Sequence, residues 1–281
     1  SGQSGPRHLR RAGSGIRGPG FRGWSGGARR SFEIGETEAT PGYLAGRINP
    51  GRVDRHPDAH DGRAHHRLDA EITLTEGPRA KKLPAPSYAA PQLNDKPGWY
   101  RIAPHVHTVH SDGRLTPAEV IALGKASGLD GIVSTDHNTT SALLHWGEVQ
   151  DPEFLVINGM EVTYGQGHWN IFGLDPHAWI DFRIHHNDTL RYRKAVAKAR
   201  KAGRLLVANH PYNLDFLYDV TPMDGIEVWN SAWSPANERA VELWHTLLVG
   251  GNRKFAVAST DFHRGGNIAS PHTSSAPKRF P

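Results

Sequence analysis

The sequence of 281 residues contains no cysteine. This absence excludes a disulfide-stabilised scaffold, a zinc site with thiolate ligands and a cysteine nucleophile. The chain also has no run of about 18 apolar residues, so we expect no membrane span and no membrane partner. Its first residues lack the apolar stretch of a secretory signal, and we therefore expect a cytoplasmic protein.

Histidine, in contrast, is abundant, with 18 residues. Imidazole and carboxylate groups without thiolates form a donor set that suits Zn, Mn or Fe. The composition therefore indicates a metal site built from histidines and acidic residues, and their positions along the chain identify the candidate ligands.

Positive charge is concentrated in the first third of the chain. Residues 1–90 carry 15 basic and 9 acidic residues, whereas residues 91–281 carry 18 and 19. Residues 1–30 hold seven Arg and nine Gly without any acidic residue, and we interpret them as a disordered leader. The alternative is a nucleic-acid-binding tail, in which Phe21 and Trp24 would be the stacking surfaces.

Residues 31–90 are interpreted as a small, poorly formed β-rich region. Its strand-like pieces, Arg30–Ile34 and Ala70–Thr75, are separated by Asp54–Asp69, which holds four His, four Asp and only one large aliphatic side chain. Such a stretch cannot cover a sheet face, and we interpret it as a solvated insertion produced by a reading-frame slip. A metal site made of its four histidines is the alternative. Similar slips are hypothesised for residues 1–20 and 267–281.

Residues 91–281 alternate between apolar strand-like runs and amphipathic helical ones. Helices are predicted after Thr116, Asp188 and Ser234, which are N-cap residues. Glycines end these helices. The alternation predicts an α/β domain with a parallel sheet, open or closed into a barrel. The predicted strands are Ile132–Ser134, Phe154–Asn158, Trp169–Phe172, Leu205–Ala208, Ile226–Trp229 and Phe255–Ala258.

Most of these strands are followed by a histidine or a carboxylate. Because sites assemble at the carboxyl ends of parallel strands, this placement predicts a shared metal site. In His105-x-His107 and Asp261-x-His263, residues two apart point to the same side if the strand continues. The predicted ligands are His105, His107, Asp112, His137, Glu161, His168, His210, Asp261 and His263.

Some of these residues also have a purely structural interpretation. Asp112 could be only a turn residue before Gly113. His168 could be a packed ring and His210 could cap a strand. His110 has no matching context, and we expect it at the surface or around the site.

The motifs HVHTVHSDG (105–113), STDHN, GMEV, GHWN, ANHP and STDFH, in this order, resemble the polymerase and histidinol phosphatase (PHP) superfamily of metal-dependent hydrolases. The resemblance is greatest to its carbaryl-hydrolase-like branch, through GMEVTYGQGHWNIFGL, DGIEVWNS and GWSGGARRSFEIGETEATPGY. Ile102-Ala103-Pro104 departs from the family pattern. Since proline lacks an amide donor, we expect the first strand to pair imperfectly.

The resemblance implies a distorted (β/α)7 barrel, here incomplete at its C-terminus, that holds two or three divalent ions (Zn, Mn or Fe). It implies one ion held by His105, His107, Glu161 and Asp261. Glu161 would bridge to a second ion held by His168 and His210. The third would be held by Asp112, His137 and His263.

These observations predict a hydrolase that uses a metal-bridging water to cleave a small phosphoester or related ester. His137 or His263, if not fully occupied as a ligand, would protonate the leaving group, and Arg264 would contact a phosphate. A carbamate or amide hydrolase is one alternative. A non-catalytic PHP module that binds nucleic acid through its basic leader is another. The oligomeric state is left open.

Overall fold

The structure is a computed structural model that describes residues 21–25, 28–47, 71–75, 77, 85–90, 98–212 and 218–275. Residues 1–20 and the Asp54–Asp69 stretch lie outside these residues, and so does the end of the chain from residue 276. The hypotheses about a leader, a second histidine site and reading-frame slips therefore stay predictions.

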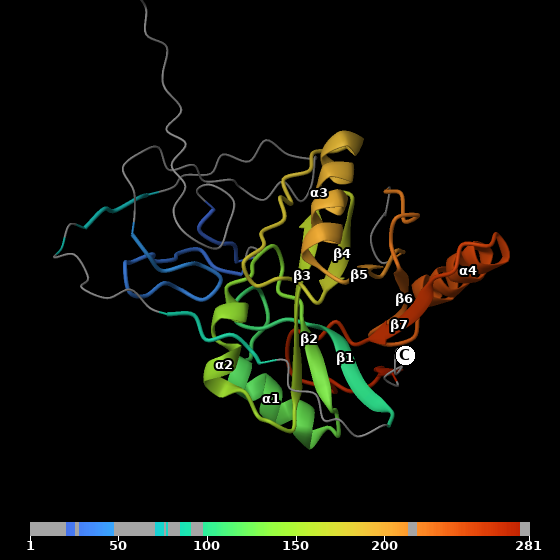
Figure 1. Cartoon of the computed structure of the whole chain (residues 1–281), viewed down its shortest axis with the longest axis horizontal. Coiled ribbons are helices and arrows are strands. Elements are labelled where there is room, and N and C mark those ends of the chain that lie inside the picture. The colour runs from blue at the N-terminus through green and yellow to red at the C-terminus, as the bar shows by residue number, and fades with distance from the viewer. Residues whose placement is uncertain are drawn as a thin grey trace, which may run out of the picture.

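Eight strands form one sheet in the described part of the chain, in the order β7-β6-β5-β4-β3-β2-β1-β8. Four helices and one 3-10 turn accompany them, and Figure 1 shows α3 lying along β3–β5 and α4 beside β6 and β7. The strands are β1 (Tyr100–Val106), β2 (Gly131–Ser134), β3 (Leu155–Tyr164), β4 (Gly167–Phe172), β5 (Leu205–Ala208), β6 (Gly225–Asn230), β7 (Phe255–Ser259) and β8 (Thr273–Ser275).

The two ends of this sheet meet, so the sheet is a nearly closed barrel. Phe262, just after β7, forms a parallel bridge with Val106 of β1. Its carbonyl accepts from the amide of His107 at 2.8 Å. Further back along the same edge of β1 lies β8, and the hydroxyl of Thr273 in β8 accepts from the amide of Ala258 and donates to the Ala258 carbonyl, both at 2.9 Å. The predicted α/β barrel class is confirmed.

The prediction of a parallel sheet is wrong for two strands. β4 runs antiparallel to both β3 and β5, and β8 runs antiparallel to β1. Only two residues, Gly165 and Gln166, connect β3 to β4. A parallel neighbour would need a crossover of about a dozen residues or more, whereas two residues suffice for a hairpin. The sequence also gave no sign of β8, which follows β7 in the segment where we expected no further barrel element.

The helices are α1 (Pro117–Ala126), α2 (Trp146–Val149), α3 (Thr189–Ala202) and α4 (Pro235–Val249), with a 3-10 turn at Ala142–Leu144. The three predicted helices, α1, α3 and α4, begin and end where the capping residues predict, whereas α2 and the 3-10 turn were not predicted. Thr116 and Glu119 form a complete capping box at the start of α1. Among the described helices, none has the length and apolar character needed to cross a bilayer.

Pro104 lies within β1 and disturbs its pairing, as the sequence predicts. The register between β1 and β2 shifts between Ala103 and Val106. Beyond the shift, the amide of Val106 donates to the side-chain hydroxyl of Thr135 at 2.8 Å. The strand is therefore held by a side chain at the point where it delivers His105 and His107 to the edge of the sheet.

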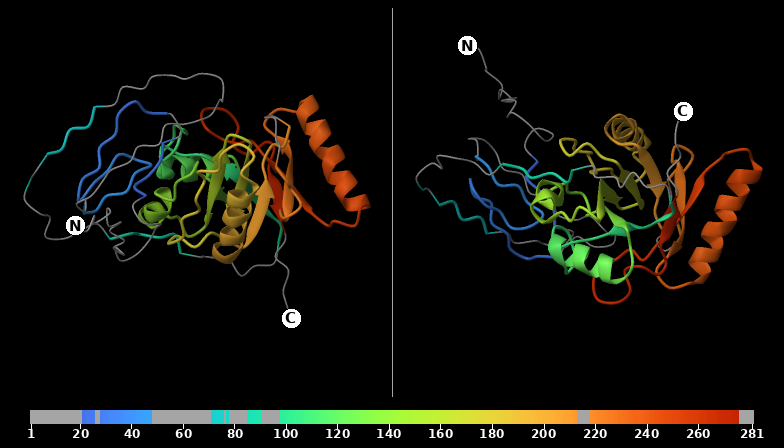
Figure 2. Two further views of the ribbon diagram at one scale, coloured as in Figure 1. Left: turned by 90° about the horizontal axis from the view of Figure 1, so that it is seen from above. Right: turned by 60° about the horizontal axis from the view of Figure 1, so that its bottom comes forward.

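The predicted strand pieces of the N-terminal region do not form strands in the described residues. Residues 31–34 contribute one isolated bridge, between Ile34 and Ala39, and residues 71–75 form none. Figure 2 shows the described N-terminal segments on the side of the molecule away from α4. Phe21 stacks on Trp179 with ring centroids 5.0 Å apart, and Trp24 meets Phe182 edge to face. These two aromatic rings are engaged within the protein.

His110 is buried, contrary to the expectation that it could lie at the surface. Its Nδ1 accepts hydrogen bonds from the amide of Gly42 at 3.4 Å and from the hydroxyl of Ser141 at 2.9 Å. Arg29 reaches the same loop and donates to the carbonyl of Val109 at 2.6 Å. His110 therefore fastens the N-terminal segment to the barrel as a neutral acceptor.

We expect His110 to make the protein sensitive to acid. Burial, and then the charges of His145 and Arg29, lower the pKa of His110 from 6.5 to about 3. Between these two pH values the unfolded chain binds a proton that the folded chain does not. The free energy of unfolding should therefore fall with falling pH, by up to about 1.4 kcal/mol per pH unit for this group.

Urea unfolding of the metal-free protein between about pH 6 and pH 4 checks this expectation. These pH values lie between the unfolded and folded pKa of His110. His110→Gln should be less stable than the parent protein near neutrality, and the difference should shrink as the pH falls. His185→Gln is the control, because His185 is exposed. A His110→Gln difference that is independent of pH would contradict the assignment.

Candidate metal centre

Residues from five separate segments converge at one edge of the barrel. All nine predicted ligands belong to groups whose donor atoms lie within 4.8 Å of one another. The four groups are His107, Asp112, His137 and His263; His105, Glu161 and His210; His105, His107 and Asp261; and His137, Glu161 and His168.

Glu161 lies at the centre of the cluster, and its side chain is fully buried. Its Oε2 atom lies 2.8 Å from Nδ1 of His137, 3.3 Å from Nε2 of His105 and 3.4 Å from Nε2 of His107. Its Oε1 atom lies 3.2 Å from Nδ1 of His168. One carboxylate therefore faces imidazoles from four different chain positions.

The antiparallel direction of β4 explains how His168 reaches this cluster. In the sequence, His168 precedes an apolar run, whereas most other predicted ligands follow one. Because β4 runs opposite to β3 and β5, its beginning lies at the edge where those two strands end. His168 is therefore brought to the common edge by the same reversal that makes the sheet mixed.

The more open half of the cluster is formed by Asp112, His137 and His263. Nε2 of His263 lies 3.3 Å from Oδ1 of Asp112, and Nε2 of His137 lies 3.7 Å from the same oxygen. Gly113 allows this arrangement, because a Cβ at this position would lie 2.4 Å from the carbonyl oxygen of His107. Any larger residue would push the loop that carries Asp112 away from the histidines.

The observed groups overlap the implied ones but differ from them around His107, His137 and His210. The resemblance implies an ion held by Glu161, His168 and His210. In the structure, His137 joins Glu161 and His168, while His210 lies with His105 and Glu161. The assignment of each residue to a particular ion is therefore still a prediction.

The donor atoms have the arrangement that suits divalent ions. Nε2 of His105, Oε2 of Glu161 and Oδ1 of Asp112 are buried and form no hydrogen bond. Buried polar atoms normally have a partner, and leaving one without a partner costs about 1–3 kcal/mol. Nitrogen and carboxylate oxygen atoms that point at a common space are the ligands that Zn, Mn and Fe accept. The cluster therefore fits a divalent metal centre.

The charges in the cluster support this conclusion. Burial would raise the pKa of Glu161, but the neighbouring His137 and His105 outweigh it and hold this pKa well below its usual range. Burial opposes a charge on His137 as well, yet Glu161 raises the pKa of His137 to about 9. Burial and the nearby His263 lower the pKa of His107 to about 3. The carboxylates thus stay ionised, while the adjacent imidazoles cannot all be protonated.

Several buried polar residues that support the ligands were not predicted. Asp136 accepts from the amide of Thr108 at 2.8 Å and from the hydroxyl of Ser111 at 2.7 Å, which shapes the loop before Asp112. Asn209 donates to Oε1 of Glu161 at 2.7 Å. Both lie beside predicted ligands, in the motifs STDHN and ANHP. Because each is a short polar residue directly after an apolar strand, the sequence could have identified both as residues that support the site.

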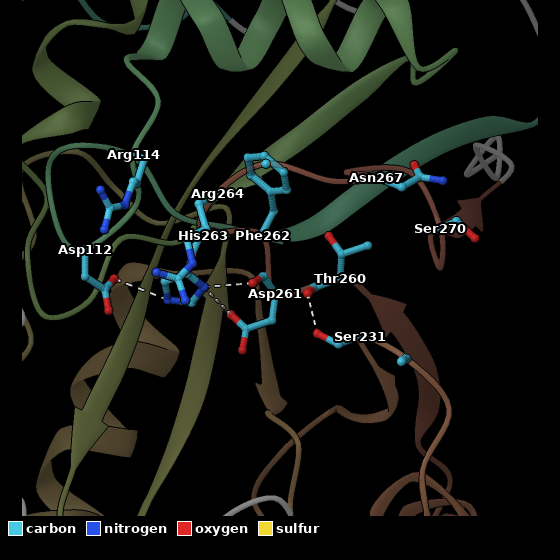
Figure 3. Close-up of a pocket in the computed structure, with 12 residues that line it drawn as sticks. Asp112, Arg114, Ser231, Thr260, Asp261, Phe262, His263, Arg264, Asn267 and Ser270 are labelled. Carbon is cyan, nitrogen blue, oxygen red and sulfur yellow. Dashed lines mark hydrogen bonds and ion pairs between the residues drawn. The ribbon is translucent and has the colours of Figure 1, made fainter.

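An open pocket of ≈ 640 Å³ adjoins the cluster of predicted ligands. Asp112, Asp261 and His263 form its inner wall, and Arg114 and Arg264 also line it. Figure 3 shows both arginines on the side of Asp112 and His263. The amide of Arg114 donates to the carbonyl of His263 at 2.7 Å, so the two arginine-bearing segments are paired. The pocket therefore places two cationic side chains beside the cluster.

No family model matches this sequence, and no curated protein matches it either. Similar solved structures include a two-domain protein from Bacteroides vulgatus with a predicted PHP-like metal-dependent phosphoesterase. It is 21% identical, and the alignment covers 66% of this chain and 57% of that chain at a TM-score of 0.43. This chain thus spans little more than half the length of that protein.

Two further structures are similar. A protein from Bifidobacterium adolescentis, assigned as a metal-dependent phosphoesterase, is 17% identical over 63% of this chain and 92% of its own, with a TM-score of 0.42. An amidohydrolase from Chromobacterium violaceum with bound sulfate and no metal is 18% identical over 61% and 90%, with a TM-score of 0.46. Each TM-score is below 0.5, so the function proposed below depends on the site geometry.

We expect the purified, reconstituted protein to bind more than one equivalent of Zn, Mn or Fe, because nine donor residues exceed what one ion uses. Glu161→Gln should lose most of this metal, since the carboxylate belongs to two of the ligand groups. Elemental analysis after gel filtration measures both quantities. Glu153→Gln, at an exposed position, is the control, whereas the buried His110 is unsuitable as one. A parent protein with only traces of metal would contradict the metal centre.

Proposed function

We propose that this chain is a metal-dependent phosphoesterase of the PHP type, and that its substrate is a small phosphate monoester. The observation that carries the proposal is the pair Arg114 and Arg264 beside the cluster of Asp112 and His263. Guanidinium groups form charge-assisted, bidentate hydrogen bonds with phosphate oxygens. A neutral carbamate would offer them no comparable charge.

Two or three divalent ions, bound by the nine ligands, would supply Lewis acidity towards the ester and lower the pKa of an attacking water. The buried half of the cluster, around Glu161 and His105, would hold its ligands away from solvent. The open half, around Asp112 and His263, would meet the substrate, because these two ligands border the pocket together with Asp261. The two arginines would orient the phosphate on that side.

When it is not occupied as a metal ligand, His263 is better placed than His137 to protonate the leaving group. Its Nδ1 donates to the carbonyl of Asp261 at 2.8 Å, which leaves Nε2 directed at Asp112. The His263 side chain is 30% exposed and lines the pocket, whereas that of His137 is 11% exposed. Burial opposes a charge on His263, but Asp112 outweighs it and raises the pKa of His263. A protonated imidazole is thus favoured on the substrate side.

The alternative functions make different demands on the chain. A carbamate or amide hydrolase, as the carbaryl-hydrolase-like resemblance implies, would not need the two arginines. A nucleic-acid-binding module would need exposed stacking surfaces, and Phe21 and Trp24 are packed against Trp179 and Phe182. The arginine pair and the metal cluster favour the phosphoesterase.

We expect Arg264→Ala and Arg114→Ala each to reduce kcat/KM for an aryl phosphate roughly 10- to 100-fold. This follows from about 1.5–3 kcal/mol for a hydrogen bond to a charged group and about 1.4 kcal/mol per factor of ten. Turnover of the corresponding neutral aryl carbamate, measured with the same metal-loaded protein, should change much less. Arg193→Ala, an exposed position on α3, is the control.

Other outcomes would favour the alternatives. Faster turnover of the carbamate than of the phosphate, with no effect of either arginine, would indicate the carbamate hydrolase. A metal-loaded protein that hydrolyses neither ester and binds nucleic acid in a salt-dependent way would indicate the binding module.

A further inference from the structure

A second buried carboxylate, Glu227 of β6, lies behind the metal cluster. It is 1% exposed and belongs to none of the ligand groups in the described residues. Its Oε1 atom lies 3.1 Å from Nδ1 of His105. Its Oε2 atom accepts from the backbone amide of His210 at 2.9 Å and from the side-chain amide of Asn230 at 3.2 Å. Three donors thus saturate a carboxylate that does not face the pocket.

The contact with His105 decides which ring nitrogen carries the proton. An ionised carboxylate can only accept hydrogen bonds, so Nδ1 of His105 must donate. In the neutral ring, Nε2 then keeps its lone pair. Nε2 faces Oε2 of Glu161 at 3.3 Å and Oδ1 of Asp261 at 3.1 Å and forms no hydrogen bond. Glu227 therefore leaves His105 in the form in which Nε2 can be a metal ligand.

The contact with His210 holds a backbone conformation that is uncommon for this residue type. His210 has a positive φ of 24° and is followed by Pro211. Such a conformation persists only where its surroundings enforce it. The hydrogen bond from the His210 amide to Glu227 connects this turn to β6. Asn230 extends the connection, because its amide also donates to Oδ2 of Asp261 at 3.3 Å.

We propose that Glu227 is a positioning residue for the metal centre: it fixes the Nδ1-protonated tautomer of His105 and holds His210 in its place near Glu161. This inference rests on the proposed metal-dependent function. Glu227 acts through three partners that belong to β1, to the segment after β5 and to β6. Carboxylates that orient metal-ligating histidines commonly change metal affinity 10- to 100-fold when they are replaced.

Glu227→Gln tests the proposal with little change in shape. A side-chain amide has one accepting oxygen and one donating NH2 group. It cannot accept from His105 on one side and from the His210 amide on the other, so one of these contacts must fail. Zinc titration against a competing chelator should show about one equivalent bound 10- to 100-fold more weakly. The group that includes Asp112 and His263 does not contact Glu227 and should bind zinc as before.

Glu242→Gln, the same chemical change on the exposed face of α4, is the matched control and should bind zinc like the parent protein. Equal zinc binding by Glu227→Gln and this control would overturn the proposal. The tautomer of His105 in the parent protein is a second measurement that does not depend on a folded variant. Long-range ¹H–¹⁵N correlation should show a proton on Nδ1 of His105 in the zinc-loaded protein. A proton on Nε2 would overturn the proposal.

These results are separable from a failure of the proposed function. A parent protein that binds zinc but hydrolyses no phosphate ester would refute the phosphoesterase and leave the affinity difference intact. A parent protein that hydrolyses phosphate esters, together with undisturbed zinc binding by Glu227→Gln, would refute the positioning role alone.

Discussion

The burial of the Glu161 carboxylate is the constraint on which the rest of the site depends. Removing an ionised carboxylate from water is costly unless charge or hydrogen bonds compensate it. Here the compensation comes from His105, His137 and His168, which lie on or beside β1, β2 and β4. None of these segments can provide it alone. The geometry of the site and the pairing of the strands therefore stabilise each other. A divalent ion bound here would satisfy the carboxylate without requiring all of its imidazole neighbours to carry protons.

The antiparallel direction of β4 brings a ligand at the beginning of a strand to the edge of the sheet where the other ligands lie. In a purely parallel barrel only the residues that follow strands would reach the site edge. The hairpin between β3 and β4 adds a strand that begins there, so His168 enters beside Glu161, with which it shares the hairpin. Two ligands of the cluster thus come from one local unit, held by backbone hydrogen bonds between adjacent strands. The remaining ligands need contacts between distant parts of the chain.

The sequence was sufficient to predict the boundaries of three helices, most strands and the convergence of the predicted ligands. Caps such as Thr116 act within one turn of chain, and most predicted ligands stand close to an apolar run. The direction of β4 follows from the two-residue connection to β3. That connection can be recognised as a hairpin only when the ends of both strands are known. The burial of His110 depends on Gly42, 68 residues away in the chain. The role of Glu227 was not predicted, although the sequence contained evidence for it. A single carboxylate inside the apolar run Ile226–Trp229 indicates a buried partner, because an unpaired acid there would be destabilising.

The two halves of the centre differ in solvent exposure. The buried half holds side chains in place, whereas the exposed half can be reached from the pocket. Glu161 and Glu227 are 0% and 1% exposed, whereas the Asp112 and His263 side chains are each 30% exposed. Carboxylates in the buried half face histidines and backbone amides and cannot meet a substrate. The open half shares its pocket with Arg114 and Arg264, so the positive charge lies on the side of the exposed ligands. The side chains and amides that contact Glu161 and Glu227 do not line this pocket, so the orientations of these buried carboxylates are set independently of the pocket wall.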